Sequence, residues 1–211
     1  MTDISDPQAG ELHYSIPNYG NKAMNEQEKL WSGDFGKTYT DRNRVDWRAR
    51  IPFWKRVLNE TGARSVTEIG CNAGWNLSAI RRAYPDIELS GIEINEYAAM
   101  QARIAGLDVP STLPVVWPRA DLVFTTGVLI HQNPDAVKIM MERIVEASFQ
   151  YVLAVEYAAE TEQEVKYRGM EGMLWKRPYG RMYRAMGLKE VDSWPAGDGF
   201  DRCAAWLLSK F

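Results

Sequence analysis

The sequence VTEIGCNAGWNL, Val66–Leu77, carries the pattern that decides the fold. A short apolar run leads into an acidic residue, a glycine turn and the start of a helix. Gly70 and Gly74 let the backbone turn sharply and approach a ligand closely, because neither residue carries a Cβ atom. The first N–H groups of the following helix lack helical partners and favour a negative or polar group. The stretch therefore predicts a ligand-binding turn between a strand and a helix.

Two ligands fit such a turn: the pyrophosphate of a dinucleotide, or the amino-acid end of S-adenosylmethionine. The loop reads Gly-Cys-Asn-Ala-Gly and lacks the middle glycine that lets the backbone approach pyrophosphate in the G-x-G-x-x-G pattern. Glu68 stands just before the loop, where its charge would repel pyrophosphate and attract an ammonium group. We therefore favour S-adenosylmethionine. The remaining alternative is a tight turn that binds nothing, and Cys71 is interpreted as a small residue inside it.

A second acidic residue, Glu93, ends the next expected strand in the sequence GIEIN. A carboxylate at this place can accept hydrogen bonds from both ribose hydroxyls of a nucleoside. Ligands of open α/β sheets bind outside the carboxyl ends of the strands, near the switch in strand order. Glu68, the glycine turn and Glu93 are therefore expected in one site.

Strands and helices alternate from residue 65 onward, and two further strands close the chain. The expected strands are 65–68, 87–95, a short one near 109, 120–124, 151–157, 188–193 and 203–209. The expected helices are 25–36, 51–62, 75–83, 97–105, 134–147 and 179–186. Alternation implies right-handed crossovers and helices on both faces of the sheet. The fold class predicted is α/β: a doubly wound, mainly parallel, seven-stranded Rossmann-like sheet with an antiparallel C-terminal edge.

Local signals mark the ends of the first helices. Asn25 and Glu28 are spaced as a capping box, and Gly33 and Gly36 mark the expected end of that helix. In the next helix, Pro52 suits the first turn. We divide the chain into residues 1–49, a segment with a helix that covers the cofactor, and residues 50–211, the main domain. A lid hairpin is expected at about 160–178.

Composition limits the possible partners. The chain has 211 residues, a formal net charge of −3 and a pI of about 5.5, and no basic run, which argues against nucleic acid. No window is apolar enough to span a membrane, and the N-terminus lacks the layout of a signal peptide. Two cysteines do not form a disulfide framework. Without metal-ligand spacing among His and Cys, no metal is expected. We expect a soluble cytoplasmic protein of unassigned oligomeric state.

At this point the chain resembles the class I S-adenosylmethionine-dependent methyltransferases over roughly residues 50–211. The segments that carry the resemblance are VTEIGCNAG, GIEIN and ADLVFTTGVLIHQNPD. A narrower resemblance covers nearly the whole chain and is to methyltransferases associated with pseudaminic acid and related surface-glycan biosynthesis. It is carried by QEKLWSGDFGKTYTDRN, GVLIHQNPD, EYAAETEQEVKYRGMEGMLWKR and WLLSK. The sequence departs from that family near AGDGFDRCAAW, which leaves the substrate open.

The resemblance implies a set of cofactor contacts. They are Glu68, Gly70, Asn72, Gly74, Glu93, Ile94, Ser111, Thr112, Thr125 and Gly127, with Trp31, Tyr39 and Arg42 in the segment that folds over the cofactor. Physical chemistry favours Arg42 as the partner of the methionine carboxylate, with Tyr39 as a second donor.

Three residues are candidates for the chemistry of transfer. His131 follows the fourth strand, and an unperturbed histidine pKa near ~6.5 suits a base at neutral pH. The alternative is that His131 braces the helix beginning near Pro134. Glu156 and Tyr157 end the fifth strand at the same edge, where they either orient the substrate or only form hydrogen bonds at the sheet end.

The hairpin supplies candidates for substrate binding. Tyr167 and Trp175 could stack on the apolar face of a sugar, and Arg168 could bind a carboxylate, with Lys176 beside them. The alternative is a solvated hairpin with Trp175 in a minor core. The sequence thus favours a methyltransferase acting on O or N of a sugar or nucleotide-sugar. The rivals are a methyltransferase of another small molecule and a non-catalytic cofactor-binding subunit.

Overall fold

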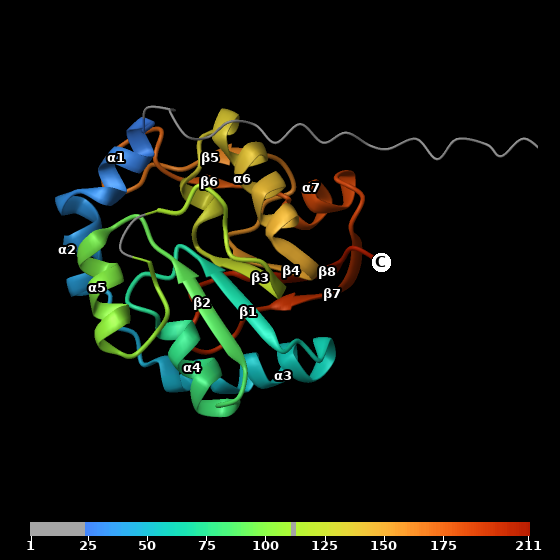
Figure 1. The fold of residues 1–211 in the computed structure, drawn as a ribbon. Helices are drawn as coiled ribbons and strands as arrows, with labels where there is room; N and C mark the ends of the chain where they lie inside the picture. The colour runs from blue at the N-terminus through green and yellow to red at the C-terminus, as the bar shows by residue number, and fades with distance from the viewer. Residues whose placement is uncertain (1–23, 111–112) are drawn as a thin grey trace, which may run out of the picture.

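The computed structural model describes residues 24–110 and 113–211. Its helices are α1 Glu26–Ser32, α2 Asp34–Arg42, the 3-10 helix η2 Trp47–Arg50, α3 Ile51–Thr61, α4 Trp75–Ala83, α5 Glu96–Ile104, the 3-10 helix η3 Leu129–His131, α6 Pro134–Ala147 and α7 Tyr179–Ala185. Its strands are β1 Ser65–Ile69, β2 Glu88–Ile92, β3 Ala120–Thr126, β4 Ser148–Glu156, β5 Gln163–Glu164, β6 Trp175–Lys176, β7 Lys189–Pro195 and β8 Ala204–Ser209. Figure 1 shows their arrangement.

The central sheet has the strand order β2-β1-β3-β4-β8-β7. Strands β1 to β4 pair in parallel, whereas β8 is antiparallel to both β4 and β7. The strand order reverses beside β1, so the loops after β1 and β3 meet at the carboxyl edge of the sheet. The predicted fold class, an α/β sheet with an antiparallel C-terminal edge, is confirmed.

The number of strands differs from the expectation. Among the described residues the sheet has six strands, and the expected strand near Val109 is reduced to one parallel bridge between Ser90 and Asp108. The Gly91 N–H donates to the Asp108 carbonyl at 2.9 Å. Pro110 follows two residues later and has no N–H to extend the ladder, which explains why the pairing stops.

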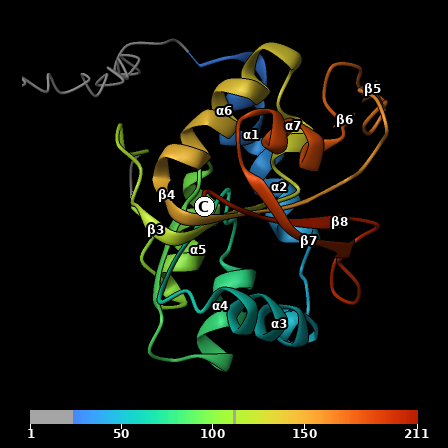
Figure 2. The ribbon, with the colours of Figure 1, turned by 90° about the vertical axis from the view of Figure 1, so that its right-hand side faces the viewer.

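Helices lie on opposite faces of this sheet (Figure 2), and each layer buries a hydrophobic core against it. On one face, buried side chains of α3, α4 and α5 pack on β1, β3 and β4, with Trp54 and Phe124 at its centre. On the other face, α6 and α7 pack on β3, β4 and β8, with Met141, Tyr179 and Tyr183 buried. Helices on both faces are what a doubly wound sheet requires, because parallel strands bury both of their sides.

The N-terminal segment folds as two helices and not as the single helix expected. Asn25 and Glu28 form the predicted capping box: the Asn25 side chain accepts from the Glu28 N–H at 2.8 Å, and Glu28 accepts from the Asn25 N–H at 2.7 Å. The helix stops at Gly33, whose backbone is extended, and α2 begins at the next residue. Gly36 therefore lies inside α2 and does not end a helix.

Candidate functional site

A cavity of about 820 Å³ lies at the carboxyl ends of β1, β2 and β3, beneath α1 and α2. In Figure 1 these two helices lie beyond the arrowheads of β1 and β2. The predicted residues that line the cavity are Trp31, Tyr39, Arg42, Glu68, Gly70, Asn72, Glu93, Ile94, Gly127, His131, Tyr157, Tyr167 and Arg168. Segments far apart in the sequence thus contribute to one site.

The glycine turn has the tight geometry that its sequence predicts. Gly70 has a φ of +73°, and a Cβ there would lie 2.4 Å from a methyl carbon of Val128. Gly74 has a φ of +77°, caps α4 and leaves no room for a Cβ beside Leu107. Gly74 therefore serves close packing and does not line the cavity. Asn72, between them, also takes a left-handed φ of +49°, a conformation that Asn tolerates better than most residues.

Glu93 fastens this turn to the end of β2. One carboxylate oxygen accepts from the Asn72 N–H at 2.7 Å, and the other accepts from the Asn95 N–H at 2.8 Å. Burial raises the pKa of the Glu93 carboxyl, and the backbone hydrogen bonds oppose that rise. Each oxygen accepts one protein hydrogen bond and, having two lone pairs, can accept a second.

Glu68 is buried at the floor of the cavity with one oxygen unsatisfied. Its Oε1 accepts from Asn76 at 2.6 Å, whereas Oε2 has no hydrogen-bond partner within residues 24–110 and 113–211. Burial raises the pKa of the Glu68 carboxyl to about 8, and the Asn76 hydrogen bond and the Arg50 charge oppose this only in part. The carboxyl is therefore largely protonated at pH 7, and a cationic ligand group beside its unsatisfied oxygen would lower this pKa and favour the charged form.

Arg50 and Asn76 extend this polar floor. Arg50 donates to the Asn76 side-chain oxygen at 2.9 Å and to the Gly199 carbonyl at 2.8 Å. The Trp54 ring N–H donates to the same Asn76 oxygen at 3.3 Å. Asn76 thus joins Arg50 to Glu68 through one amide, which holds a guanidinium near the unsatisfied carboxylate oxygen.

Aromatic side chains of the N-terminal helices cover the cavity. Trp31 lies with its ring centroid 5.1 Å from Tyr39, 5.2 Å from Phe35 and 4.6 Å from His131. The Arg42 guanidinium lies over the Tyr39 ring at 5.4 Å. Helices α1 and α2 therefore cover the cavity, and the Trp31 ring reaches the loop after β3.

His131 is buried between rings. Its Nδ1 lies 2.8 Å from the Met173 carbonyl, which can only accept, so the proton sits on Nδ1 and the lone pair on Nε2. The Tyr167 ring centroid lies 5.1 Å away on the hairpin side. Burial lowers the pKa of His131 to about 4, in contrast to the expected unperturbed value. The imidazole is therefore neutral at pH 7.

Glu156 acts on the backbone of the loop that carries His131. The carboxylate is fully buried and accepts from the N–H groups of Val128 and Leu129 at 3.2 Å and of Ile130 at 3.4 Å. Burial raises the pKa of Glu156 to about 7. Glu156 does not line the cavity. This geometry favours the sheet-end hydrogen-bonding role over contact with a substrate.

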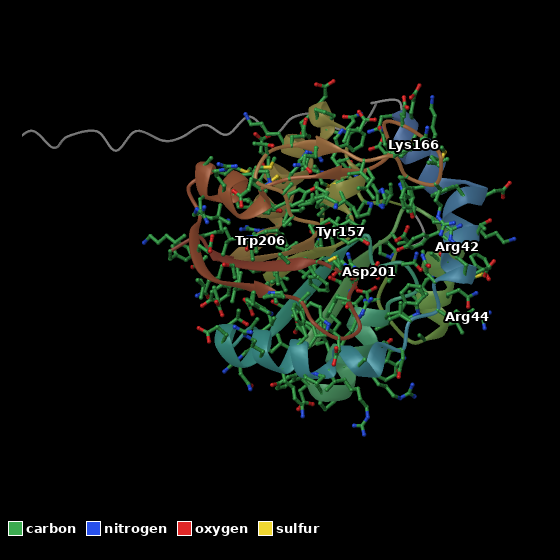
Figure 3. All side chains as sticks on the ribbon, turned by 180° about the vertical axis from the view of Figure 1, so that it is seen from behind. Arg42, Arg44, Tyr157, Lys166, Asp201 and Trp206 are labelled. Carbon is green, nitrogen blue, oxygen red and sulfur yellow. The ribbon has the colours of Figure 1, made fainter. Side chains whose placement is uncertain are left out.

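Tyr157, the next residue, does line the cavity. Its hydroxyl donates to the Asp201 carboxylate at 2.9 Å, and the two side chains lie together in Figure 3. In that view Arg42 and Arg44 lie on one side of the pair and Lys166 of the hairpin lies above. Burial raises the pKa of Tyr157 well above its ordinary value, and the Asp201 hydrogen bond adds to the rise, so the phenol keeps its proton.

The segment expected to form the hairpin contains β5 and β6, and its four predicted residues lie in two different environments. Tyr167 and Arg168 line the cavity, and the Arg168 guanidinium lies 5.9 Å from the Tyr167 ring centroid. Trp175 is buried, with the Arg177 guanidinium 5.2 Å from its ring centroid, and Lys176 pairs with Gln163 in the two-stranded antiparallel sheet of β5 and β6. Neither of these two lines the cavity, and the minor-core alternative describes Trp175 better.

The remaining predicted residues lie apart from the cavity or outside the described chain. Thr125 is buried within β3 and is absent from the cavity lining. Ser111 and Thr112 fall outside the described residues. Sequence reasoning missed several buried polar residues of the cavity, among them Gln27, Arg50, Asn76 and Asn95. Only Asn76 had a usable signal, its place in the first turn of the helix after the glycine loop.

The described residues contain no metal-binding cluster, no disulfide bond and no membrane-spanning helix. The described part of the chain holds no group of three or more His, Cys, Asp or Glu residues placed to bind a metal ion. Cys71 and Cys203 are free and buried. Of the helices in the described residues, none has both the length and the apolar character needed to cross a membrane.

Comparison with known proteins relates this architecture to one class of fold. No protein-family model matches the sequence, and no curated protein matches it. Among solved structures, the mitomycin 7-O-methyltransferase MmcR is similar with a TM-score of 0.65 and 17% identity over 88% of this chain. This chain spans only 60% of that protein's length.

Two further solved structures match over most of both chains. The 1,6-didemethyltoxoflavin-N1-methyltransferase of Burkholderia thailandensis has a TM-score of 0.66 and 17% identity over 90% of this chain and 92% of its own. The sugar N-methyltransferase KedS8 from Streptoalloteichus sp ATCC 53650 has a TM-score of 0.63 and 14% identity over 100% and 98%. At these identities the likeness shows the fold, which is the Rossmann-like methyltransferase fold.

Proposed function

We propose that this protein is an S-adenosylmethionine-dependent methyltransferase that acts on O or N of a small polar substrate. The observation that supports it best is the placement of Glu68 and Glu93 on either side of the Gly70 turn in one cavity. The toxoflavin enzyme of the same fold was solved with S-adenosylhomocysteine bound. A dinucleotide fits less well, because the unsatisfied Glu68 oxygen would face its pyrophosphate.

The cavity offers partners for each polar part of the cofactor. The free lone pairs of Glu93 suit two ribose hydroxyls, and the unsatisfied Glu68 oxygen suits the methionine ammonium group. Arg42 remains our candidate for the methionine carboxylate, and the buried Arg50 is a second cation within the same lining. Ile94 lies beside Glu93 and supplies apolar surface for the adenine.

The bound cofactor supplies an electrophilic methyl group on a sulfonium centre, and the protein must position the acceptor and exclude water. Trp31, Tyr39 and Tyr167 cover the cavity with rings that exclude water. Such positioning contributes ~7–11 kcal/mol in well-oriented reactions. His131 keeps a lone pair on Nε2 at neutral pH and serves as the residue that orients the acceptor hydroxyl or amine by accepting a hydrogen bond from it.

We further propose that the acceptor is a sugar or nucleotide-sugar used in surface-glycan synthesis in the cytoplasm. Tyr167 offers a ring for the apolar face of a sugar, and Arg168 offers a guanidinium for a carboxylate or phosphate. The sugar N-methyltransferase among the structural relatives also agrees with a sugar acceptor. The alternative acceptor is another small molecule, since the mitomycin and toxoflavin enzymes share the fold.

The test is transfer of a labelled methyl group from S-adenosylmethionine to a panel of nucleotide-sugars, free sugars and unrelated small molecules. We expect label in a nucleotide-sugar, and a rate reduced by roughly 10²-fold in His131→Asn, because the acceptor is no longer oriented. Glu88→Ala is the matched control, because Glu88 is exposed at the start of β2 and lies outside the cavity. Cofactor binding without transfer to any acceptor would instead favour a non-catalytic cofactor-binding subunit.

A further inference from the structure

The loop Val128–Gln132, which carries His131, is held by two buried side chains, Glu156 at the end of β4 and Arg177 after β6. Glu156 accepts from three of its N–H groups. Arg177, which is fully buried, donates to the carbonyls of Leu129 at 3.2 Å and Gln132 at 2.9 Å. These hydrogen bonds fix the backbone of the loop. They do not contact the imidazole ring.

A third connection comes from Gln27 of α1. Gln27 is 7% exposed, and its Nε2 donates to the Gly172 carbonyl of the hairpin at 3.0 Å. Its Oε1 accepts from the Asn133 side chain at 3.0 Å. A single amide therefore joins three segments that are 106 and 145 residues apart in sequence.

Both hydrogen-bond partners of Gln27 lie close in sequence to the residues that determine the position of the His131 ring. Gly172 precedes Met173, whose carbonyl accepts from His131 Nδ1. Asn133 follows His131 by two residues and caps α6 by accepting from the Ala136 N–H at 2.8 Å. Trp31 lies one helical turn after Gln27, on the same face of α1, and its ring packs on the imidazole at 4.6 Å.

We propose that Gln27 is a positioning residue for His131. By hydrogen-bonding α1 to the hairpin and to the residue that follows the loop after β3, Gln27 keeps the imidazole buried and oriented. This inference rests on the proposed function for the role of His131 toward the acceptor. Gln27 itself touches no reacting atom. Figure 1 shows α1 beside the hairpin segment that it contacts.

The His131 ring can report on this role directly by nuclear magnetic resonance. The chain has two histidines, so the signal lost in His131→Asn identifies the residue. Gln27→Met keeps the length of the side chain and removes both hydrogen bonds. Gln27→Asn keeps the amide but is too short to reach both partners. Lys29→Met is the matched control, because Lys29 is exposed on the same helix.

In the wild type we expect a neutral ring with its proton on Nδ1 and a pKa near the value of about 4 that burial gives it. In both Gln27 variants we expect the pKa of His131 to rise toward its ordinary value, because the ring becomes less buried. The control should keep the wild-type titration. Wild-type titration and tautomer in both folded Gln27 variants would overturn the proposal.

The titration needs neither cofactor nor acceptor, so its outcome is independent of whether methyl transfer is found. Where transfer is found, a second readout applies. Gln27→Met should lower kcat and leave the affinity for S-adenosylmethionine near that of the wild type, because Glu68 and Glu93 are untouched. If Gln27→Met lost cofactor affinity and kcat to the same extent, the proposal would be contradicted. That result would indicate that α1 and α2 pack less firmly over the whole cavity.

Discussion

At the scale of single residues, the buried Glu68 and the half-buried Glu93 prepare the cavity in different ways. Glu93 already accepts two backbone hydrogen bonds and holds the glycine turn in place. Glu68 accepts one hydrogen bond and leaves an oxygen unsatisfied. A buried carboxyl oxygen without a hydrogen-bond partner costs stability, and sites that bind charged ligands are where such costs are retained.

This cost predicts how stability depends on pH. The pKa of Glu68 rises from an ordinary 4.5 to about 8 in the folded protein. Between those values the folded state binds a proton that the unfolded state has lost, so stability falls as pH rises through this window. Each pKa unit corresponds to about 1.4 kcal/mol. Glu156, with a pKa of about 7, contributes in the same direction.

We therefore expect Glu68→Gln to lose less stability than the wild type between pH 5 and pH 8, because glutamine does not titrate. Urea unfolding at the two pH values measures the difference. Glu88→Gln, an exposed position at the start of β2, should keep the wild-type dependence. The same slope in Glu68→Gln and the wild type would show that Glu68 is not protonated in the folded protein.

At the scale of elements, the helices α1 and α2 that cover the cavity are short, and α1 depends on hydrogen bonds at both of its ends. Helix α1 has only seven residues and begins with the Asn25–Glu28 capping box. Near its other end, the Asn95 side chain donates to the carbonyls of Trp31 at 2.8 Å and Gly33 at 3.0 Å. A helix this short is not stable alone, so these contacts hold α1 in place over the cavity.

Removing the N-cap of α1 should destabilise this helix without unfolding the rest of the protein. Asn25→Ala is expected to destabilise α1 by ~0.5–2 kcal/mol, because the Glu28 N–H loses its acceptor. Hydrogen exchange of residues 26–32 should accelerate accordingly, whereas residues 134–147 of α6 should not change. Lys29→Ala serves as the control on the same helix. Equal acceleration in α1 and α6 would show that the two unfold together.

At the scale of the whole molecule, the cavity lies where the sheet edge, the N-terminal helices, the His131 loop and the hairpin meet. Local sequence signals predicted the sheet and its helices well. The bounds of α4 and α6 agree with the expected 75–83 and 134–147, because a glycine turn and an Asn-Pro pair mark their starts. The strand near Val109 was wrong, because Pro110 ends the pairing.

The candidate site was predictable only in part. Glu68 and Glu93 follow from their places at strand ends, which is local information. Gln27 and Arg50 contact residues far along the chain, and no local pattern marks such contacts. The low pKa of His131 depends on burial by Trp31 and Tyr167, which is a property of the assembled fold.

The most direct test of the account is calorimetric titration of the folded protein with S-adenosylmethionine and S-adenosylhomocysteine, on the wild type, Glu93→Ala and Glu88→Ala. We expect both compounds to bind the wild type and Glu88→Ala. In Glu93→Ala the affinity should fall by roughly 10-fold or more, because hydrogen bonds to a charged group contribute ~1.5–3 kcal/mol. Absence of binding of either compound to the folded wild type would contradict the account and leave the glycine turn as a turn only.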